Sequence, residues 1–202
     1  MIAAEDTRRT RTLLARYGIG TPMLSYYEHN KRRRGPELVE RLKAGDRVAL
    51  VTDAGTPGIS DPGFHLVRLA RDAGVPVTPV PGPSAVTAAL SAAGIPGDRF
   101  AFEGFLPVKR GRRLARLRAL HALGRPVVLY ESPHRLAATL EALAEVFGTA
   151  EVVLSRELTK QFEEFRRGTA AELAAAVRQE RLRGEITLVV NPAASGEGPD
   201  DG

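Results

Sequence analysis

Short apolar segments and helix-like patterns alternate along the whole chain of 202 residues, and this alternation limits the possible folds more than any other feature. Residues 48–51 are all apolar, as expected of a strand that is covered on both faces. Leu136, Leu140 and Leu143 recur instead at the spacing of one helix face. Strands and helices that alternate in this way predict an α/β fold with helices on both faces of the sheet.

The turn cluster at residues 94–97 divides the chain into two parts of similar length. We therefore expect an amino-terminal α/β domain over residues 1–96 and a carboxyl-terminal α/β domain over residues 97–192. Residues 193–202 consist mainly of Gly, Ser, Pro and acidic residues, a composition typical of a disordered tail.

Caps and breakers place the individual elements within these parts. Asp6 is suited to cap a helix that ends at Gly18, and Ser132-Pro133 is suited to open another helix. The remaining segments are expected to be helices over 37–43, 61–74, 83–93 and 110–122, a final Ala-rich helix before residue 186, and strands or extended segments over 23–26, 75–80, 100–102, 127–130, 152–154, 162–166 and 186–190.

Composition excludes several classes of protein. The chain has no cysteine, which excludes disulfides, thiolate catalysis and cysteine-based metal sites. Its four histidines show no pairing that supports a metal site of another kind. No apolar run approaches the ~20 residues of a membrane span, and the charged amino end is unlike a signal peptide. These features are compatible with a cytoplasmic protein.

The chain is moderately basic, with 29 Lys and Arg residues against 24 Asp and Glu residues and a net charge of +5. Two interpretations stay open at this point. The arginines form a solvated surface, or they bind an anionic partner such as RNA.

The loop over residues 52–63 is the first segment that could carry chemistry. It follows an expected strand and precedes an expected helix, which is where open α/β sheets bind ligands. Small residues let a ligand reach the backbone, while Asp53 and Asp61 suit a ligand with hydroxyls, an amine or a positive sulfur rather than a phosphate. A connecting loop in which Asp61 only caps the next helix is an equal alternative.

Four further segments each allow a purely structural interpretation and a functional one. The turn at 81–86 is a Pro-initiated helix start or a place where Ser84 donates a hydrogen bond. The basic residues at 109–118 face solvent or grip phosphate, although they do not form a single helical stripe. The segment at 130–135 holds a surface histidine or an acid/base pair, and the segment at 27–34 is a solvated loop or an RNA-facing one.

Eight segments together resemble, in order and spacing, the ribosomal small-subunit methyltransferase I family. They are AEDTRRT, SYYEHN, VTDAGTPGISDPG, PGPSAV, FEGFLPVKRGRR, YESPHR, RELTKQFEE and GEITLVV. The family belongs to the tetrapyrrole-methylase-like group of S-adenosylmethionine (SAM) enzymes, and the resemblance covers about residues 2–191.

The resemblance implies two α/β domains with SAM in the cleft between them, in a cytoplasmic bacterial enzyme that is usually a homodimer. The implied reaction methylates the ribose 2′-hydroxyl of a cytidine in the decoding region of 16S rRNA. The implied cofactor residues are Asp53, Ala54, Gly55, Thr56, Ile59, Ser60 and Asp61 in the first loop, Pro83, Ser84 and Ala85 in the second turn, and Phe105, Leu106 and Tyr130 in the second domain.

The amino end departs from the family pattern. Members begin with a further strand and helix, whose Gly-Asn-rich opening loop forms part of the cofactor cleft. Residues 1–6 correspond to the position just after that unit, so we expect the first strand–helix unit to be missing from this chain, and a misplaced start codon is the favoured explanation. Loss of a strand would leave unpaired backbone and exposed apolar surface.

Methyl transfer to a hydroxyl depends on alignment of the reacting atoms, which can supply ~7–11 kcal/mol. The ribose hydroxyl is a weak nucleophile, so a base within hydrogen-bond reach is expected to assist. Lys109 and Glu131 are the two candidates for this base, and Lys109 could equally contact a phosphate.

Two other functions stay open. A tetrapyrrole C-methyltransferase of the precorrin type would share the fold, although the Arg-rich segment at 109–118 suits a polyphosphate better than a macrocycle. An inactive RNA-binding remnant is the alternative outside enzymes, and it predicts RNA binding without SAM binding.

Overall fold

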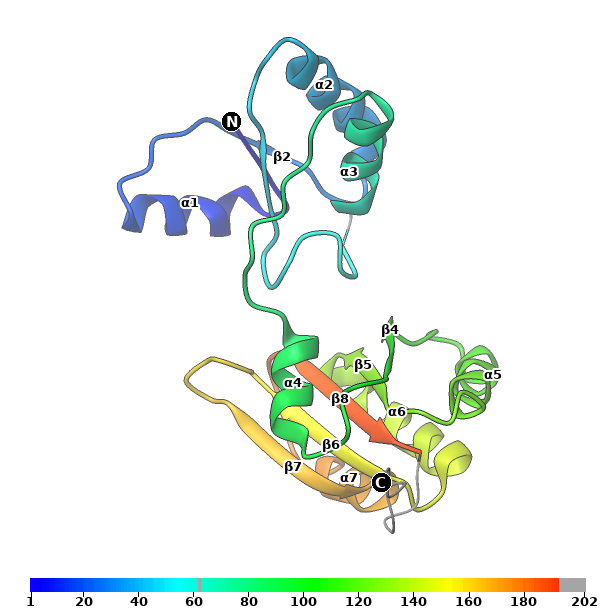
Figure 1. The fold of residues 1–202 in the computed structure, drawn as a ribbon. Coiled ribbons are helices and arrows are strands. Elements are labelled where there is room, and N and C mark those ends of the chain that lie inside the picture. Colours follow the sequence, from blue (N-terminus) through cyan, green and yellow to red (C-terminus); the bar gives the residue numbers. More distant parts are fainter. Residues whose placement is uncertain (62, 193–202) are drawn as a thin grey trace, which may run out of the picture. The chain divides into compact units, whose positions relative to one another are not determined.

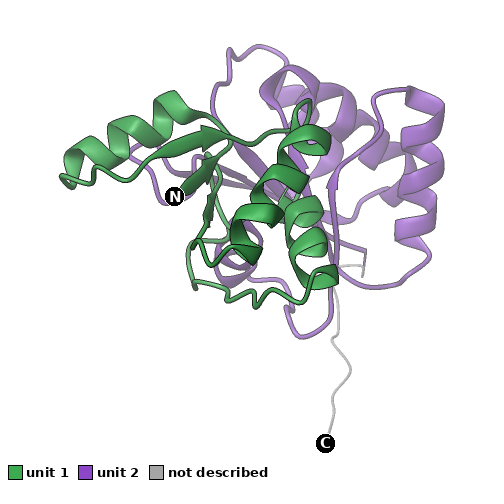
Figure 2. Cartoon of the chain, turned by 90° about the horizontal axis from the view of Figure 1, so that it is seen from above, with its two compact units in different colours: residues 1–84 green, residues 85–202 purple. Residues whose placement is uncertain are grey.

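The computed structural model describes residues 1–61 and 63–192, and it divides into two compact units, Met1–Ser84 and Ala85–Gly202 (Figure 2). The tail expected to be disordered, residues 193–202, lies outside the described residues. The two units meet in sequence at Ser84, ahead of the turn cluster at 94–97. The helix between these two positions packs with the second unit, and the domain division at residue 96 stays a prediction.

Unit 1 is built on a parallel sheet of three short strands in the order β2-β1-β3. The central strand β1 (Ile2–Ala4) is fully buried, and it pairs in parallel with β2 (Met23–Ser25) and with β3 (Ala49–Val51). Parallel neighbours need crossover segments, which α1 (Thr7–Arg16) and α2 (Lys31–Lys43) supply. The helix α3 (Gly63–Asp72) follows β3.

The first helix starts where its cap was predicted. The Asp6 carboxylate accepts a hydrogen bond from the Arg8 backbone N–H at 2.8 Å, which satisfies one of the free donors of the first turn. The apolar side chains of this region stay largely outside the core, since Leu13 in α1 is 53% exposed and Tyr17, which follows the helix as its C-cap, is 71% exposed. Only Thr10 of this helix is buried.

Three segments of unit 1 differ from the sequence predictions. Helix α2 begins at Lys31 rather than at residue 37, so Pro36 lies inside it. Strand β3 is not covered on both faces, because Ala49 is exposed and Leu50 and Val51 are only partly buried. Residues 75–80 pair with no strand among the described residues, and they are mostly exposed, with Val80 at 84%. An extended segment without a neighbouring strand cannot form the backbone hydrogen bonds that define a sheet.

The core of unit 1 is small and lies between the sheet and the helix pair α2 and α3, which run side by side in Figure 1. Leu38 and Leu66 pack there against Tyr26, which is 1% exposed. The hydroxyl of Tyr26 is hydrogen-bonded to His65 Nδ1 at 3.1 Å, so the buried phenol keeps a polar partner.

Unit 2 is built on a five-stranded mixed sheet in the order β4-β5-β8-β6-β7. Its strands are β4 (Ala101–Phe105), β5 (Val127–Glu131), β6 (Glu151–Arg156), β7 (Glu164–Thr169) and β8 (Ile186–Asn191). Strands β4 and β5 are parallel, and the remaining neighbours are antiparallel.

Helices cover both faces of this sheet, as the alternation in the sequence predicts (Figure 1). Val128, Val153 and Val189 point to one face and pack against α4 (Ala85–Ala93). The residues before and after each of these valines point to the other face, where α5 (Arg110–His121), α6 (Pro133–Phe147) and α7 (Ala170–Val177) form the larger core. Within the described part of the chain, no helix is both long enough and apolar enough to cross a membrane.

The burial of Tyr26 makes unit 1 sensitive to alkaline pH. Burial, with a smaller contribution from the charge of Glu28, raises the pKa of Tyr26 to about 12, from an ordinary value of 10.0. The folded chain therefore holds this proton more tightly than the unfolded chain does. The resulting stabilisation is complete below pH 10 and is lost as the pH rises toward 12.

We expect Tyr26→Phe, which has no proton to lose, to remove this part of the pH dependence. The measurement is the free energy of unfolding in urea at increasing alkaline pH, for both chains. Parallel curves for the two chains would contradict the prediction.

Candidate functional site

The loop after β3 begins with a small cluster of charges at the carboxyl end of the unit 1 sheet. The backbone N–H of Asp53 donates to the Glu5 carboxylate at 3.1 Å, and the Asp53 carboxylate lies 3.4 Å from the Arg9 guanidinium. Glu5 and Arg9 follow β1, while Asp53 follows β3, so the parallel pairing of these strands brings the three residues together.

Asp61 organises the middle of the same loop. Its Oδ1 accepts from the backbone N–H of Gly58 at 2.8 Å and from that of Gly63, the first residue of α3, at 2.7 Å. Between them Ser60 has a φ of 63°, a bend that residues with a side chain rarely adopt. The carboxylate thus caps the helix and holds the loop closed on itself, which is the structural alternative that the sequence left open.

The second predicted turn lies against this loop within unit 1. The Thr56 hydroxyl donates to the Pro83 carbonyl at 3.1 Å, so the two turns are in contact, although among the described residues no strand of the sheet directly precedes the second turn. Asp53, Ala54, Gly55, Ile59 and Ser60 are exposed, while Thr56 is half-buried. Of the second turn, Ser84 ends unit 1 and Ala85 begins α4 in unit 2.

The site residues predicted in unit 2 gather at the carboxyl ends of β4 and β5. The pairing of these strands is interrupted by a bulge between Phe102 and Gly104, where Gly104 takes a φ of 69°. Residues three apart in a regular strand face opposite sides, but the extra residue turns Phe105 to the same side as Phe102. Both rings then contact Tyr130, at centroid distances of 5.0 Å for Phe102 and 5.8 Å for Phe105.

These aromatic residues differ in what they offer a ligand. Phe105 is 52% exposed, whereas the neighbouring Leu106 is 2% exposed and its side chain belongs to the core. A ligand at this turn would therefore meet the Phe105 ring and the backbone of Leu106. Burial, and to a smaller extent the charge of Glu185, raises the pKa of the Tyr130 phenol, which thus stays protonated at neutral pH.

The two candidate bases have opposite surroundings. Lys109 is exposed at the start of α5, and no acidic partner pairs with it among the described residues. Glu131 is 2% exposed, and its carboxylate accepts from the Ser132 backbone N–H at 2.8 Å and from the Thr139 hydroxyl at 2.5 Å. The role of either residue as a base stays a prediction.

Three of the five arginines of α5 form ion pairs inside the unit, with two carboxylates between them. Arg116 forms a bidentate pair with Glu103 at 2.6 Å for both contacts, and Arg110 and Arg118 both pair with Glu145. Arg113 is 7% exposed and donates to the Val108 carbonyl at 3.3 Å, so it belongs to the packing of the helix rather than to its surface. Arg112 is exposed and without an ion-pair partner among the described residues, as is Lys109.

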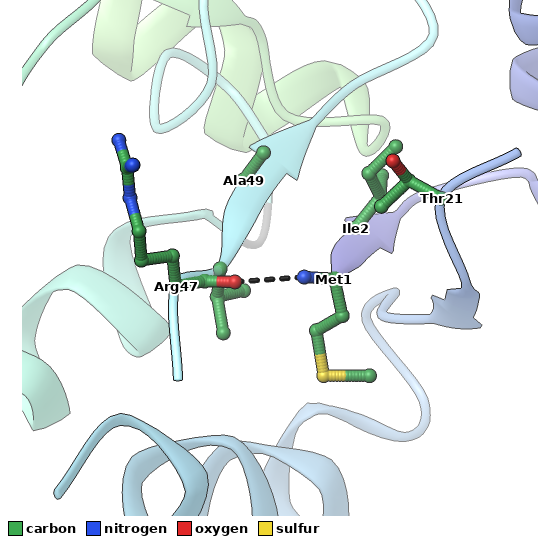
Figure 3. Close-up of a pocket in the computed structure, with 6 residues that line it drawn as sticks. Met1, Ile2, Thr21, Arg47 and Ala49 are labelled. Carbon is green, nitrogen blue, oxygen red and sulfur yellow. Dashed lines mark hydrogen bonds between the residues drawn. The ribbon is translucent and has the colours of Figure 1, made fainter. Parts of the chain in front are cut away.

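An open pocket of about 450 Å³ lies at the amino ends of the three unit 1 strands (Figure 3). Met1, Ile2, Thr21 and Ala49 line it, and the amino group of Met1 donates to the Arg47 carbonyl at 2.7 Å. The predicted loops lie at the other, carboxyl, ends of the same strands, where α/β sheets bind ligands. The pocket is therefore separate from the candidate site.

The structure thus brings the predicted residues together in two sets. One set is the unit 1 loop with Pro83, and the other is Phe105, Leu106 and Tyr130 with Glu131 close by in unit 2. Among the described residues no three His, Asp or Glu side chains gather in a way that could hold a metal ion. Four residues with contacts at these places were not predicted from the sequence, namely Glu5, Arg9, Thr139 and Arg135. Glu5 and Arg9 belong to the motif AEDTRRT, and Arg135 belongs to YESPHR.

Comparison with known proteins identifies the family of the chain. A family model described as Tetrapyrrole (Corrin/Porphyrin) Methylases matches residues 1–174. A relative from Mesorhizobium japonicum named ribosomal RNA small subunit methyltransferase I is 49% identical over 204 residues, or 100% of this chain and 69% of the relative. A relative of the same name from Xylella fastidiosa is 50% identical over 197 residues, or 96% of this chain and 72% of the relative.

The chain belongs to the ribosomal RNA small subunit methyltransferase I family, within the tetrapyrrole methylases. This confirms the family resemblance and the α/β fold class drawn from the sequence. A solved structure of uroporphyrin-III C-methyltransferase from Thermus thermophilus, in complex with S-adenosylhomocysteine, has the same fold with a TM-score of 0.62. It is 17% identical and covers 95% of this chain and 85% of its own, so it shows the fold alone.

The close packing around Asp61 predicts that the loop does not accept a side chain at Gly63. A Cβ there would lie 2.6 Å from the Gly58 nitrogen and 2.8 Å from Asp61 Oδ1. We expect Gly63→Ala to lower the free energy of unfolding of unit 1 by about 1–3 kcal/mol, because backbone atoms must move to make room.

Gly20→Ala is the matched control, since a Cβ at Gly20 has no atom within 4 Å. Urea unfolding followed by circular dichroism compares the two variants. Equal stabilities would show that the loop is less tightly packed than the distances indicate.

Proposed function

We propose that the chain transfers a methyl group from SAM to the ribose 2′-hydroxyl of a cytidine in the decoding region of 16S rRNA. The observation that carries the proposal is the identity of 49% and 50% to two relatives named ribosomal RNA small subunit methyltransferase I, over almost the whole chain. Family membership supports methylation of small-subunit rRNA. The cytidine, the 2′-hydroxyl and the decoding region are the more specific part of the proposal.

The cofactor is supported by the shared fold and by the donor groups of the loop. The related fold holds S-adenosylhomocysteine, which is SAM after loss of its methyl group. Asp53 offers a half-shielded carboxylate for hydroxyls or an amine, and the exposed Ala54 and Gly55 leave the backbone within reach. When bound, SAM supplies a methyl group on a positively charged sulfur.

The residues of the chain contribute position and charge to this reaction. The loop after β3 would hold the amine and hydroxyl end of the cofactor. The family resemblance also implies a cofactor contact for Phe105 and for the Leu106 backbone. Lys109 stays a candidate base, because its side chain is exposed and has no ion-pair partner among the described residues; its ammonium group would have to lose a proton before it could accept one from the ribose hydroxyl.

The direct test is methyl transfer from labelled SAM to small ribosomal subunits that lack the modification, with the labelled nucleotide identified by mass spectrometry. The expected product is a 2′-O-methylcytidine in the decoding region. RNA binding without SAM binding would favour the inactive remnant instead. Activity on a precorrin-type tetrapyrrole would favour a C-methyltransferase.

A homodimer and a cytoplasmic location also stay predictions, which sedimentation and fractionation can test.

Asp53 is expected to contribute directly to cofactor affinity. Removal of a charged hydrogen-bond partner costs about 1.5–3 kcal/mol, so Asp53→Ala should weaken S-adenosylhomocysteine binding roughly tenfold or more in calorimetric titration. Asp61→Ala should weaken it as well, through disorder of the loop that Asp61 holds. Asp46→Ala is the control, because Asp46 is exposed and pairs only with Arg41 among the described residues. It precedes β3, and so it lies at the amino ends of the strands, opposite to the loop. Equal affinities in all variants would reject the loop as the cofactor site.

RNA affinity is expected to depend on the two unpaired cations near the start of α5. Lys109→Glu with Arg112→Glu should weaken RNA binding at moderate salt and reduce the salt dependence by about two units of slope, with S-adenosylhomocysteine binding retained. Arg113 is left unchanged because it is buried.

Arg99→Glu with Arg125→Glu makes the same change of charge at the amino ends of β4 and β5, and it serves as the control in the filter-binding measurement. If both pairs weaken binding equally, the effect is one of net charge rather than of this surface.

A further inference from the structure

A buried carboxylate in unit 2 is placed where a charge is costly. The Glu131 side chain is 0% exposed at the end of β5, among the apolar residues of the larger core. Its Oε1 accepts from the Ser132 backbone N–H and its Oε2 from the Thr139 hydroxyl, which belongs to the second turn of α6. Thr139 is itself 0% exposed. A buried carboxylate is retained only when such partners satisfy it.

Arg135 connects this carboxylate to the turn after β4. Its Nε lies 3.5 Å from Glu131 Oε1, and its Nη2 donates to the Leu106 carbonyl at 2.5 Å. The Nε is buried and has no hydrogen-bond partner among the described residues, so the nearby carboxylate is what compensates its charge. The guanidinium therefore spans from α6 to a carbonyl 29 positions earlier in the chain.

The turn at residues 105–107, whose Leu106 carbonyl accepts from Arg135, follows an irregular part of β4. Residues 105–107 leave β4 just after the bulge at Gly104, where the regular pairing with β5 has been shifted. The Leu106 side chain is held by the core, but its carbonyl would be left without this partner if Arg135 moved. Phe105, beside it, is the exposed ring that faces Tyr130.

We infer that Glu131, Thr139 and Arg135 are positioning residues, which hold the turn at residues 105–107 in the shape that receives the methyl donor. Glu131 orients Arg135, and Arg135 holds the Leu106 carbonyl, so that the Leu106 backbone and the Phe105 ring are kept in place. The inference rests on the proposed function, in which this turn contacts the cofactor. It gives Glu131 a role other than that of a base, since the side chain is 0% exposed and its carboxylate is held by these partners.

The first test measures the turn itself. Arg135→Gln should accelerate hydrogen exchange over residues 102–108, which comprise the paired end of β4 and the turn after it, with the amides of β8 unchanged. Thr139→Val, which has nearly the same shape and lacks the hydroxyl, should give a smaller acceleration at the same amides. Arg178→Gln is the matched control, because Arg178 pairs with Glu141 on the same helix α6 and should leave the turn unaffected.

The second test measures binding of S-adenosylhomocysteine by calorimetry, at a temperature where circular dichroism shows each variant to be folded. Arg135→Gln should bind roughly tenfold more weakly, in line with the loss of one charged hydrogen bond. Arg135→Lys should recover part of the affinity, because an ammonium group can reach one of the two partners but not both.

The outcomes separate this inference from the proposed function. Unchanged exchange over residues 102–108 in Arg135→Gln would overturn the positioning role, whatever the cofactor. A loosened turn in a chain whose unaltered form binds no S-adenosylhomocysteine would instead count against the proposed function. Glu131→Gln that abolishes methyl transfer while leaving both exchange and affinity unchanged would show that Glu131 is a base after all.

Discussion

The burial of both faces of the five-stranded sheet is the interaction on which unit 2 depends. Each of β5, β6 and β8 carries apolar residues on consecutive positions, so that one face packs on α4 and the other on α5, α6 and α7. The positions where β4 and β5 end follow from this packing, and with them the places of Phe105, Tyr130 and Glu131. Unit 1 has a smaller core, and its site is held more by hydrogen bonds to Asp53, Asp61 and Thr56 than by packing.

Charge is used differently in the two places that the proposed function needs. At the loop of unit 1 the carboxylates are in contact with backbone N–H groups and with Arg9, which suits a ligand bound through polar atoms. On α5 three of the five arginines are in ion pairs with Glu103 and Glu145, and Arg113 is buried. A basic helix in a sequence is therefore a poor measure of its capacity for RNA, since pairing within the molecule decides which cations are available.

The sequence predicts what depends on local pattern, and it predicts less well what depends on neighbours. The cap at Asp6, the apolar face of α6 and the strand at 186–190 are visible as caps or periodicities, and the structure contains them. Residues 75–80 have the pattern of a strand, but a strand forms only beside a neighbouring strand, and the pattern does not show whether one is present. Likewise Arg113 reads as a surface cation, and only the fold shows that it is buried against Val108. The contact between Arg135 and Leu106 spans two elements, which no spacing rule detects.

The bulge in β4 sets the parity of everything that follows it. One residue is added to β4 and not to its neighbour, so Phe102 and Phe105 lie on the same face of the sheet. In a regular strand the two side chains would lie on opposite faces. Removal of Gly104 would leave the charge and the other residues of the strand unchanged, and yet would turn the second ring toward the opposite face of the sheet. Length in this short stretch is thus as strict a requirement as chemistry, and a relative with one residue fewer there would need a different way to present an aromatic ring beside its tyrosine.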